Sequence, residues 1–102
     1  MRKILFLVLL IFPVVSKAGV HCEEEITQVI LHKNNNLYFR SSETCPKNWC
    51  QVKWSGEGDR DRVFSMFLTA KVASKKLVLY WEGLDSCDVE NPTYSSPGYI
   101  VF

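Results

Sequence analysis

Two aromatic side chains of this chain lie next to amide side chains in stretches rich in turn-forming residues. Trp49 follows Asn48 in a segment bounded by cysteines, and Tyr94 lies close to Asn91. Sugars present apolar ring faces edged by hydroxyl groups, so a carbohydrate site favours a partly exposed aromatic ring with hydrogen-bonding neighbours. We therefore take Trp49, Asn48, Asn91 and Tyr94 as candidate ligand-binding residues. The alternative is that both rings merely pack on their own loops.

Catalytic residues are difficult to identify in the same sequence. Its two histidines are His21, close to the amino terminus of the expected mature protein, and His32, at the end of an expected strand. A nucleophilic serine needs an adjacent base, and no serine here has the sequence context of a nucleophile elbow. We expect a protein that is not an enzyme and that carries no cofactor.

The cysteines are the remaining residues with distinctive chemistry, and there are four of them: Cys22, Cys45, Cys50 and Cys87. An even number of cysteines in a small exported chain predicts two disulfides, which leaves no free thiol as a nucleophile. Four cysteines allow three pairings, and the sequence does not select among them. Zinc binding is the competing use, but the chain has no Cys-x-x-Cys pair, and an oxidising compartment disfavours thiolates. We expect no metal site.

The amino-terminal segment predicts export. Arg2 and Lys3 precede an uncharged apolar run at 4–15, and Ser16-Lys17-Ala18 has small residues at both positions that a signal peptidase reads. This pattern is typical of a signal peptide that is cleaved after Ala18. A run of about twelve apolar residues is too short to span a bilayer core of about 30 Å. We expect a single mature domain, residues 19–102, that is periplasmic or secreted and has no membrane segment.

The charge of the mature domain argues against one class of partner. Removal of the signal peptide takes three positive charges from a formal net charge of +1 and leaves −2. Five of the nine remaining basic residues lie at 60–76, where Asp59 and Asp61 dilute their charge. Because nucleic-acid binding needs a basic surface, we expect no nucleic-acid partner.

Alternating and β-branched apolar residues predict five strands, at residues 26–32, 37–40, 49–54, 77–81 and 99–102. Asn34–Asn36 predicts a hairpin turn between the first two strands, because Asn tolerates the left-handed backbone region. We interpret Glu23–Glu25 as a solvated entry to the first strand. Trp54, Tyr80 and Trp81 are expected in the core.

One long amphipathic helix is predicted at residues 60–76, with Asp59 or Asp61 favouring its start. One apolar face has core spacing and comprises Val63, Met66, Phe67, Ala70 and Ala73. Phe64, Leu68 and Val72 form a second apolar line beside it. Either the loop at 83–97 folds over this second line, or the line is a subunit interface of a homo-oligomer.

The resulting order of elements is β-β-β-α-β-β. In a mature domain of this size, it predicts an α+β, mostly β fold: a small antiparallel barrel of the OB type with one helix. A plain α+β sheet with the helix packed on one face is the alternative. The order of elements does not distinguish these two architectures.

Several of these features together resemble a known family. They are the export signal, the four-cysteine domain, the hairpin before Trp49, the Phe64-Leu68-Val72 line and the Cys87 segment before a last strand. Small exported bacterial proteins with these features are similar to the cell-binding B subunits of pertussis-like and subtilase-like AB5 toxins. The resemblance implies an OB fold, assembly as a ring of five and binding of cell-surface glycans. It transfers no sugar-contacting residue to a definite position.

Two function classes follow from these expectations. The first is a non-catalytic binding module for a surface glycan or a protein receptor. The second is a small periplasmic inhibitor or accessory protein that acts by protein-protein contact. A protein that forms a ring and binds sugar would favour the first class, whereas a monomer that co-purifies with one periplasmic protein would favour the second.

Overall fold

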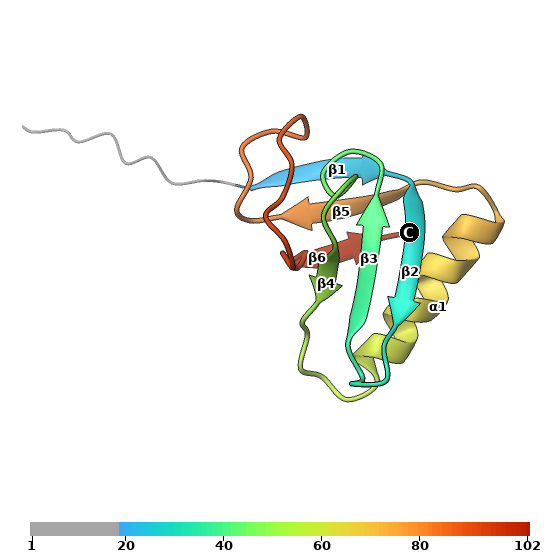
Figure 1. Ribbon diagram of the computed structural model, residues 1–102. Coiled ribbons are helices and arrows are strands. Elements are labelled where there is room, and N and C mark those ends of the chain that lie inside the picture. Colours follow the sequence, from blue (N-terminus) through green and yellow to red (C-terminus); the bar gives the residue numbers. More distant parts are fainter. Residues whose placement is uncertain (1–18) are drawn as a thin grey trace, which may run out of the picture.

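The computed structural model of the chain describes residues 19–102 (Figure 1). This part of the chain is a small α+β domain, mostly β, with six strands and one helix. The predicted signal peptide, residues 1–18, lies outside the described residues, so its cleavage stays a prediction. Within residues 19–102, no helix is long and apolar enough to cross a membrane.

The strands and the helix follow one another in the order β-β-β-β-α-β-β, which has one strand more than the sequence predicted. Their bounds are β1 Val20–Glu24, β2 Ile26–Leu31, β3 Leu37–Ser41, β4 Cys50–Val52, α1 Asp59–Val72, β5 Leu77–Trp81 and β6 Tyr99–Val101. All five predicted strands are present: three of them are shorter than predicted, β3 is one residue longer, and β5 has the predicted bounds. The strand that the sequence analysis missed is β1.

The strands form two three-stranded antiparallel sheets, in the orders β1-β5-β6 and β2-β3-β4. The chain passes from the first sheet to the second at Glu25, between β1 and β2, and the two sheets cross one another (Figure 1). Within the described residues, no strand pairing closes these sheets into a barrel. The α+β prediction is therefore confirmed, whereas the barrel is not.

The prediction that the acidic run at Glu23–Glu25 is exposed to solvent is wrong for one of its residues. These residues are not a solvated entry, because Val20–Glu24 pairs with β5 in a register that places Cys22 opposite Leu79. Alternation along β1 turns Cys22 and Glu24 inward, and both side chains are buried. Glu23 and Glu25 point outward and are exposed. Charge alone suggested solvent for all three residues, but strand alternation takes the middle one into the core.

The buried carboxylate of Glu24 is fully hydrogen-bonded. One oxygen accepts from the backbone N–H groups of Glu43 (3.1 Å) and Thr44 (2.8 Å). The other accepts from the Thr44 hydroxyl (2.8 Å) and from the indole N–H of Trp81 (3.0 Å). A carboxylate offers about four acceptor sites, and these four donors occupy them. The arrangement offsets the cost of burying the group and links β1, β5 and the loop after β3.

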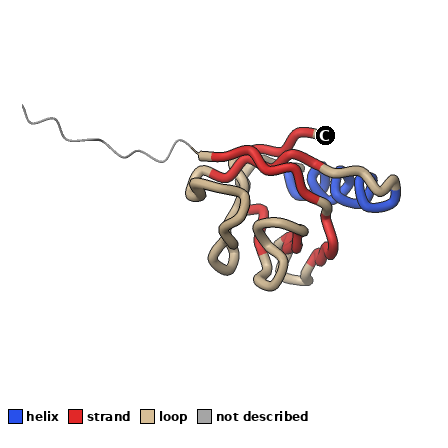
Figure 2. The backbone as a smooth tube through the Cα atoms, turned by 90° about the horizontal axis from the view of Figure 1, so that it is seen from above, coloured by secondary structure: helices blue, strands red, loops and turns tan. Residues whose placement is uncertain are grey.

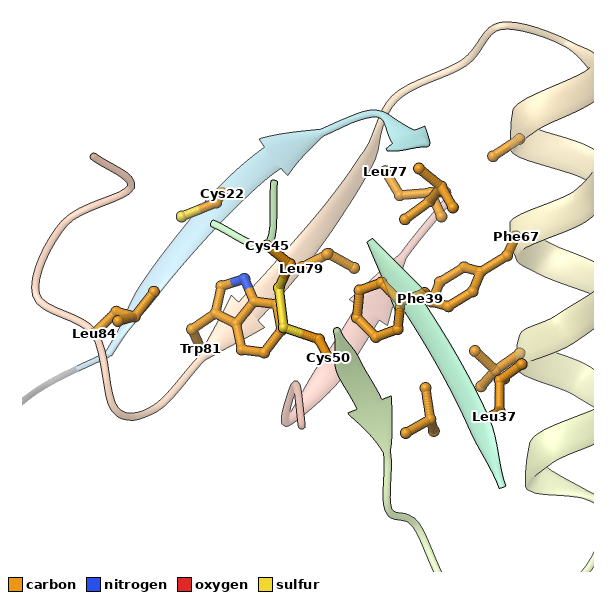
Figure 3. Packing of buried hydrophobic residues seen from close by; sticks show 14 residues of the cluster. Cys22, Leu37, Phe39, Cys45, Cys50, Phe67, Leu77, Leu79, Trp81 and Leu84 are labelled. Carbon is orange, nitrogen blue, oxygen red and sulfur yellow. A yellow bond between two sulfur atoms is a disulfide. The ribbon is translucent and has the colours of Figure 1, made fainter. Parts of the chain in front are cut away.

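The hydrophobic core lies between the two sheets and the helix (Figure 3). Phe39 of β3 is its centre, with its ring 4.8 Å from that of Phe67 and 6.3 Å from that of Trp81. Trp81 is buried, as predicted. Trp54 is only half-buried, and its indole N–H donates to the carbonyl of Pro97 (2.8 Å).

Tyr80 is not a core residue. Alternation along β5 turns Leu77, Leu79 and Trp81 inward and leaves Tyr80 on the outer face of its sheet. There its ring stacks on Tyr99 at 4.7 Å. The apolar composition of both faces of β5 misled the sequence analysis, because only one face meets the core.

The helix lies at one end of the sheets, away from most of the loops (Figure 2). Val63, Phe67 and Ala70 are buried as predicted, Met66 is half-buried, and Ala73 is exposed because the helix has already ended. Its start is capped by Gly58 and not by an aspartate side chain; Asp59 and Asp61 lie in the first turn, where negative charge favours the helix dipole.

The carboxy-terminal end of α1 comes earlier than predicted. Ser74 has a left-handed backbone (φ 54°), the N–H of Ser74 donates to the Lys71 carbonyl (3.2 Å), and that of Lys75 donates to Ala70 (2.8 Å). These two bonds form the Schellman arrangement that ends many helices. Glycine is usual at this position, and its absence explains why the sequence analysis extended the helix to residue 76.

Two disulfides are present, as predicted, and the structure supplies their pairing. Cys22 is joined to Cys87, and Cys45 is joined to Cys50. Their sequence separations are 65 and 5 residues. In the chain-entropy model, loops of these lengths correspond to about 4 and about 2 kcal/mol of stabilisation. The first bridge fastens the loop after β5 to β1, and the second closes a short loop before β4.

Candidate functional site

An open pocket of about 240 Å³ lies at the outer surface of the β2-β3-β4 sheet. It is lined by five side chains, four of which are aromatic or imidazole rings: Ile30, His32, Tyr38, Trp49 and Tyr94. These residues come from five segments of the chain, namely β2, the hairpin turn, β3, the loop before β4 and the loop between β5 and β6. This pocket is the candidate site.

The strand register explains why three of these residues lie together. Ile30 of β2 is paired with Tyr38 of β3, so both project from the same face of the sheet. Phe39 is paired with Cys50, which places Arg40 beside Trp49 on the same outer face. His32 follows β2 at the hairpin turn, where Asn35 has the predicted left-handed backbone (φ 74°).

Tyr94 reaches the pocket because the long loop after β5 runs along β4. Its backbone N–H donates to the carbonyl of Trp49 (2.6 Å), and the N–H of Gln51 donates to the carbonyl of Ser95 (2.9 Å). Tyr94 has a left-handed backbone (φ 67°), which is unfavourable for a bulky side chain. Strained residues of this kind cluster at functional sites, where the surrounding structure holds them.

Three of the rings contact one another, and the fourth, that of Trp49, is covered by Arg40. The rings of Tyr38 and Tyr94 lie 5.4 Å apart, and the ring of His32 meets Tyr38 edge-on at 6.3 Å. The guanidinium of Arg40 lies over the ring of Trp49, 4.2 Å from its centre. Arg40 is held in turn by a hydrogen bond to the Gln28 side chain (2.9 Å). These contacts fix the orientation of the rings in the absence of a ligand.

The hydroxyl group of Tyr38 is polarised by its neighbours. The amide nitrogen of Asn36 donates to this hydroxyl (3.1 Å). Hydrogen bonds from the side chains of Asn36 and Asn34 lower the pKa of Tyr38 from its ordinary value of 10.0, because they favour the charged phenolate. His32 Nδ1 accepts from the backbone N–H of Asn34 (3.1 Å), which leaves Nε2 as the donor of the neutral ring.

The four predicted ligand residues fall into two groups. Trp49 and Tyr94 both line the pocket. Asn48 and Asn91 do not: Asn91 is only 4% exposed, its amide nitrogen donates to the sulfur of Cys45 (3.5 Å), and its carbonyl accepts from Asn48 (3.4 Å). Proximity in sequence suggested a ligand contact for Asn91, but its side chain is turned toward the buried disulfide.

Three lining residues, Ile30, His32 and Tyr38, were not predicted from the sequence. The predicted hairpin contains the pattern from which they could have been inferred. Strands at 26–32 and 37–40 joined by a short turn place alternate residues of both strands on one face. The face of Ile30 and Tyr38 could therefore have been inferred, but its proximity to Trp49 depends on the pairing of β3 with β4.

The predicted interface residues Phe64, Leu68 and Val72 lie on α1. Phe64 packs partly against the core, whereas Leu68 is 41% and Val72 is 86% exposed. The loop at 83–97 packs along the segment before and within β4, through the bonds of Tyr94 and Ser95 described above. It therefore does not cover Leu68 and Val72, contrary to the first of the two predicted arrangements.

A second cavity, of about 470 Å³, lies between α1 and the carboxy-terminal residue Phe102. Its other lining residues all lie on the helix and are polar except for Met66: Asp61, Arg62, Ser65, Met66 and Thr69. Lys75 lies 5.5 Å from the centre of the Phe102 ring. Phe102 is the one aromatic ring that lines this cavity, whereas three aromatic side chains line the first pocket.

Aromatic rings beside amide and hydroxyl groups are suited to a ligand that has both apolar faces and hydrogen-bonding edges. Residues 19–102 contain no cluster of three His, Cys, Asp or Glu side chains arranged to hold a metal ion. No protein-family model, curated protein or solved structure matches this chain. A function for this site is therefore inferred from its geometry.

We expect the Asn36→Ala substitution to raise the pKa of Tyr38 toward its ordinary value, because it removes the main donor that stabilises the phenolate. A pH titration of the tyrosine ring carbons by NMR measures this change. Asn48→Ala is the control, since Asn48 is an exposed amide outside the pocket. A Tyr38 midpoint that is the same in all three proteins would contradict the polarisation of this hydroxyl.

Proposed function

We propose that this protein is an exported, non-catalytic binding module that recognises carbohydrate through the Ile30, His32, Tyr38, Trp49 and Tyr94 pocket. The observation that carries the proposal is the meeting of three aromatic side chains, Tyr38, Trp49 and Tyr94, in one open pocket. Stacking of a sugar ring on such a surface excludes water from its apolar face, while its hydroxyl groups remain at the polar rim.

The contacts around the pocket favour binding of a small rigid ligand. Arg40 covers one face of Trp49, and backbone bonds fix Tyr94, so few side chains need to be ordered when a ligand binds. Preorganisation of this kind lowers the entropy cost of association. The two disulfides support the export part of the proposal, because disulfides persist in oxidising compartments.

The position of the pocket supports an OB-like architecture as part of the same proposal. OB folds bind oligosaccharides and oligonucleotides on the face of their second and third strands, between the loops that follow the first and fourth strands. β1 and β2 can be counted as one bent strand, because only Glu25 separates them. In that count, Tyr38 and Trp49 belong to the face of the second and third strands. His32 then belongs to the loop after the first strand, and Tyr94 to the loop after the fourth strand.

The carbohydrate proposal is tested with a glycan array and protein purified after expression of the full chain. We expect binding to a subset of glycans, and a loss of at least about fivefold in affinity for Trp49→Ala, because one buried aromatic contact is worth about 1 kcal/mol or more. Tyr99→Ala is the control, since Tyr99 is an exposed ring on the other sheet.

Two outcomes count against carbohydrate recognition. An array on which the folded wild-type protein binds no glycan would exclude it, and so would binding that Trp49→Ala leaves unchanged. Capture of one periplasmic protein by a monomer that binds no glycan would instead favour the inhibitor or accessory class.

We also propose that Leu68 and Val72 mediate self-association, as the resemblance to toxin B subunits suggests. The supporting observation is that both apolar side chains project from α1 with 41% and 86% of their surfaces exposed. Contiguous exposed apolar surface marks sites of protein-protein contact, and these two side chains lie one helical turn apart on the same face of α1.

Replacement of Leu68 and Val72 by lysine should convert an oligomer into a folded monomer, because lysine charges cannot be buried in an apolar contact. Light scattering measures the mass, and circular dichroism checks the fold. A wild-type protein that is monomeric at all concentrations would contradict the proposed contact.

A further inference from the structure

The polar groups of the pocket are few and differ from those that a simple hexose requires. A hexose carries hydroxyl groups around most of its edge, each of which needs a hydrogen-bonding partner or water when it is buried. The pocket offers the hydroxyl groups of Tyr38 and Tyr94, the His32 ring nitrogen and the Trp49 indole N–H, beside apolar surface from Ile30 and the ring faces. A ligand that carries an apolar substituent beside one strong acceptor matches this surface better.

The Tyr38 hydroxyl is prepared to donate a hydrogen bond. Because its oxygen accepts from the Asn36 amide, its own proton is directed to another acceptor. Hydrogen bonds received by a hydroxyl oxygen strengthen the bond that the hydroxyl donates. The ring is also held in place between His32 and Tyr94.

Ile30 provides the apolar counterpart to this donor. It is paired with Tyr38 in the sheet, and 40% of its surface is exposed although it lies among the rings of the pocket. Both side chains line the same pocket, and their Cβ atoms lie about 5 Å apart as directly paired residues, so one small ligand can contact Ile30 and the Tyr38 hydroxyl together. A methyl group for Ile30 and a carbonyl oxygen for Tyr38 are the two ends of an acetamido substituent.

We propose that the pocket selects 2-acetamido sugars, with Tyr38 donating to the acetamido carbonyl oxygen and Ile30 packing on the acetamido methyl group. The sugar ring then lies on the surface formed by Trp49 and Tyr94. This inference rests on the proposed carbohydrate function and names its ligand class. The pocket volume of about 240 Å³ suits one substituted sugar ring, since it is below the roughly 300 to 1,000 Å³ of drug-sized sites.

The test compares four monosaccharides as probes for the wild-type protein: N-acetylglucosamine, N-acetylgalactosamine, glucose and galactose. Binding is measured by NMR chemical-shift titration of the backbone amides. We expect at least one 2-acetamido sugar to bind about tenfold more tightly than its unsubstituted counterpart, with the shift changes centred on Tyr38 and Tyr94. A site built around a donor discriminates strongly against a ligand that lacks the matching acceptor.

Two variants test the assigned contacts. Tyr38→Phe keeps the ring and removes the donor, so it should reduce the preference for the 2-acetamido sugar to about threefold or less while binding of the unsubstituted sugar changes little. Tyr99→Phe is the matched control, since Tyr99 is a tyrosine of the other sheet, and it should leave the preference unchanged.

The outcomes separate this inference from the proposed function. Equal binding of substituted and unsubstituted sugars, or a preference that Tyr38→Phe does not reduce, overturns the acetamido assignment and leaves carbohydrate binding in place. Failure of all four probes on a protein that still binds glycans on the array also overturns the assignment. Failure of the probes together with an empty array overturns the proposed function itself.

Discussion

The buried carboxylate of Glu24 is the interaction on which the rest of the domain depends. It joins β1 to the indole of Trp81 on β5 and to Thr44 in the loop after β3, so a single side chain connects the two sheets. A small domain has few apolar contacts with which to fix two crossed sheets. A fully satisfied polar cluster in its core supplies a specific geometry that apolar packing alone does not.

The same cluster positions the candidate site. The carbonyl of Thr44 accepts from the backbone N–H of Asn91 (2.7 Å), where the long loop begins its course along β4. Three residues later, Tyr94 enters the pocket opposite Tyr38. The Cys45–Cys50 bridge closes the neighbouring loop and fixes Trp49 at its end. The loops that carry Trp49 and Tyr94 to the strand residues of the pocket are therefore fastened to the core at Thr44 and Cys45, which lets them hold a strained Tyr94.

Local pattern was sufficient to predict the α1 helix, the β2-β3 hairpin, two disulfides and the general place of Trp49 and Tyr94. It failed at Glu24, because the burial of one carboxylate in a row of three depends on pairing with a strand more than 50 residues away in sequence. It failed at Asn91 because a turn residue can bond to a disulfide that only the fold brings near. Tyr38 was not predicted as a lining residue, because the register of β2, β3 and β4 decides which of their side chains meet in one pocket.

The measurement that tests the central role of Glu24 most directly is the free energy of unfolding of Glu24→Gln in urea, beside Glu23→Gln and Glu25→Gln as exposed neighbours. A Gln side chain presents an N–H group where one carboxylate oxygen accepts two hydrogen bonds, so buried donors lose their partner. We expect Glu24→Gln to lose about 3 kcal/mol and each neighbour to change by less than about 0.5 kcal/mol. Equal, small effects for all three substitutions would contradict the account.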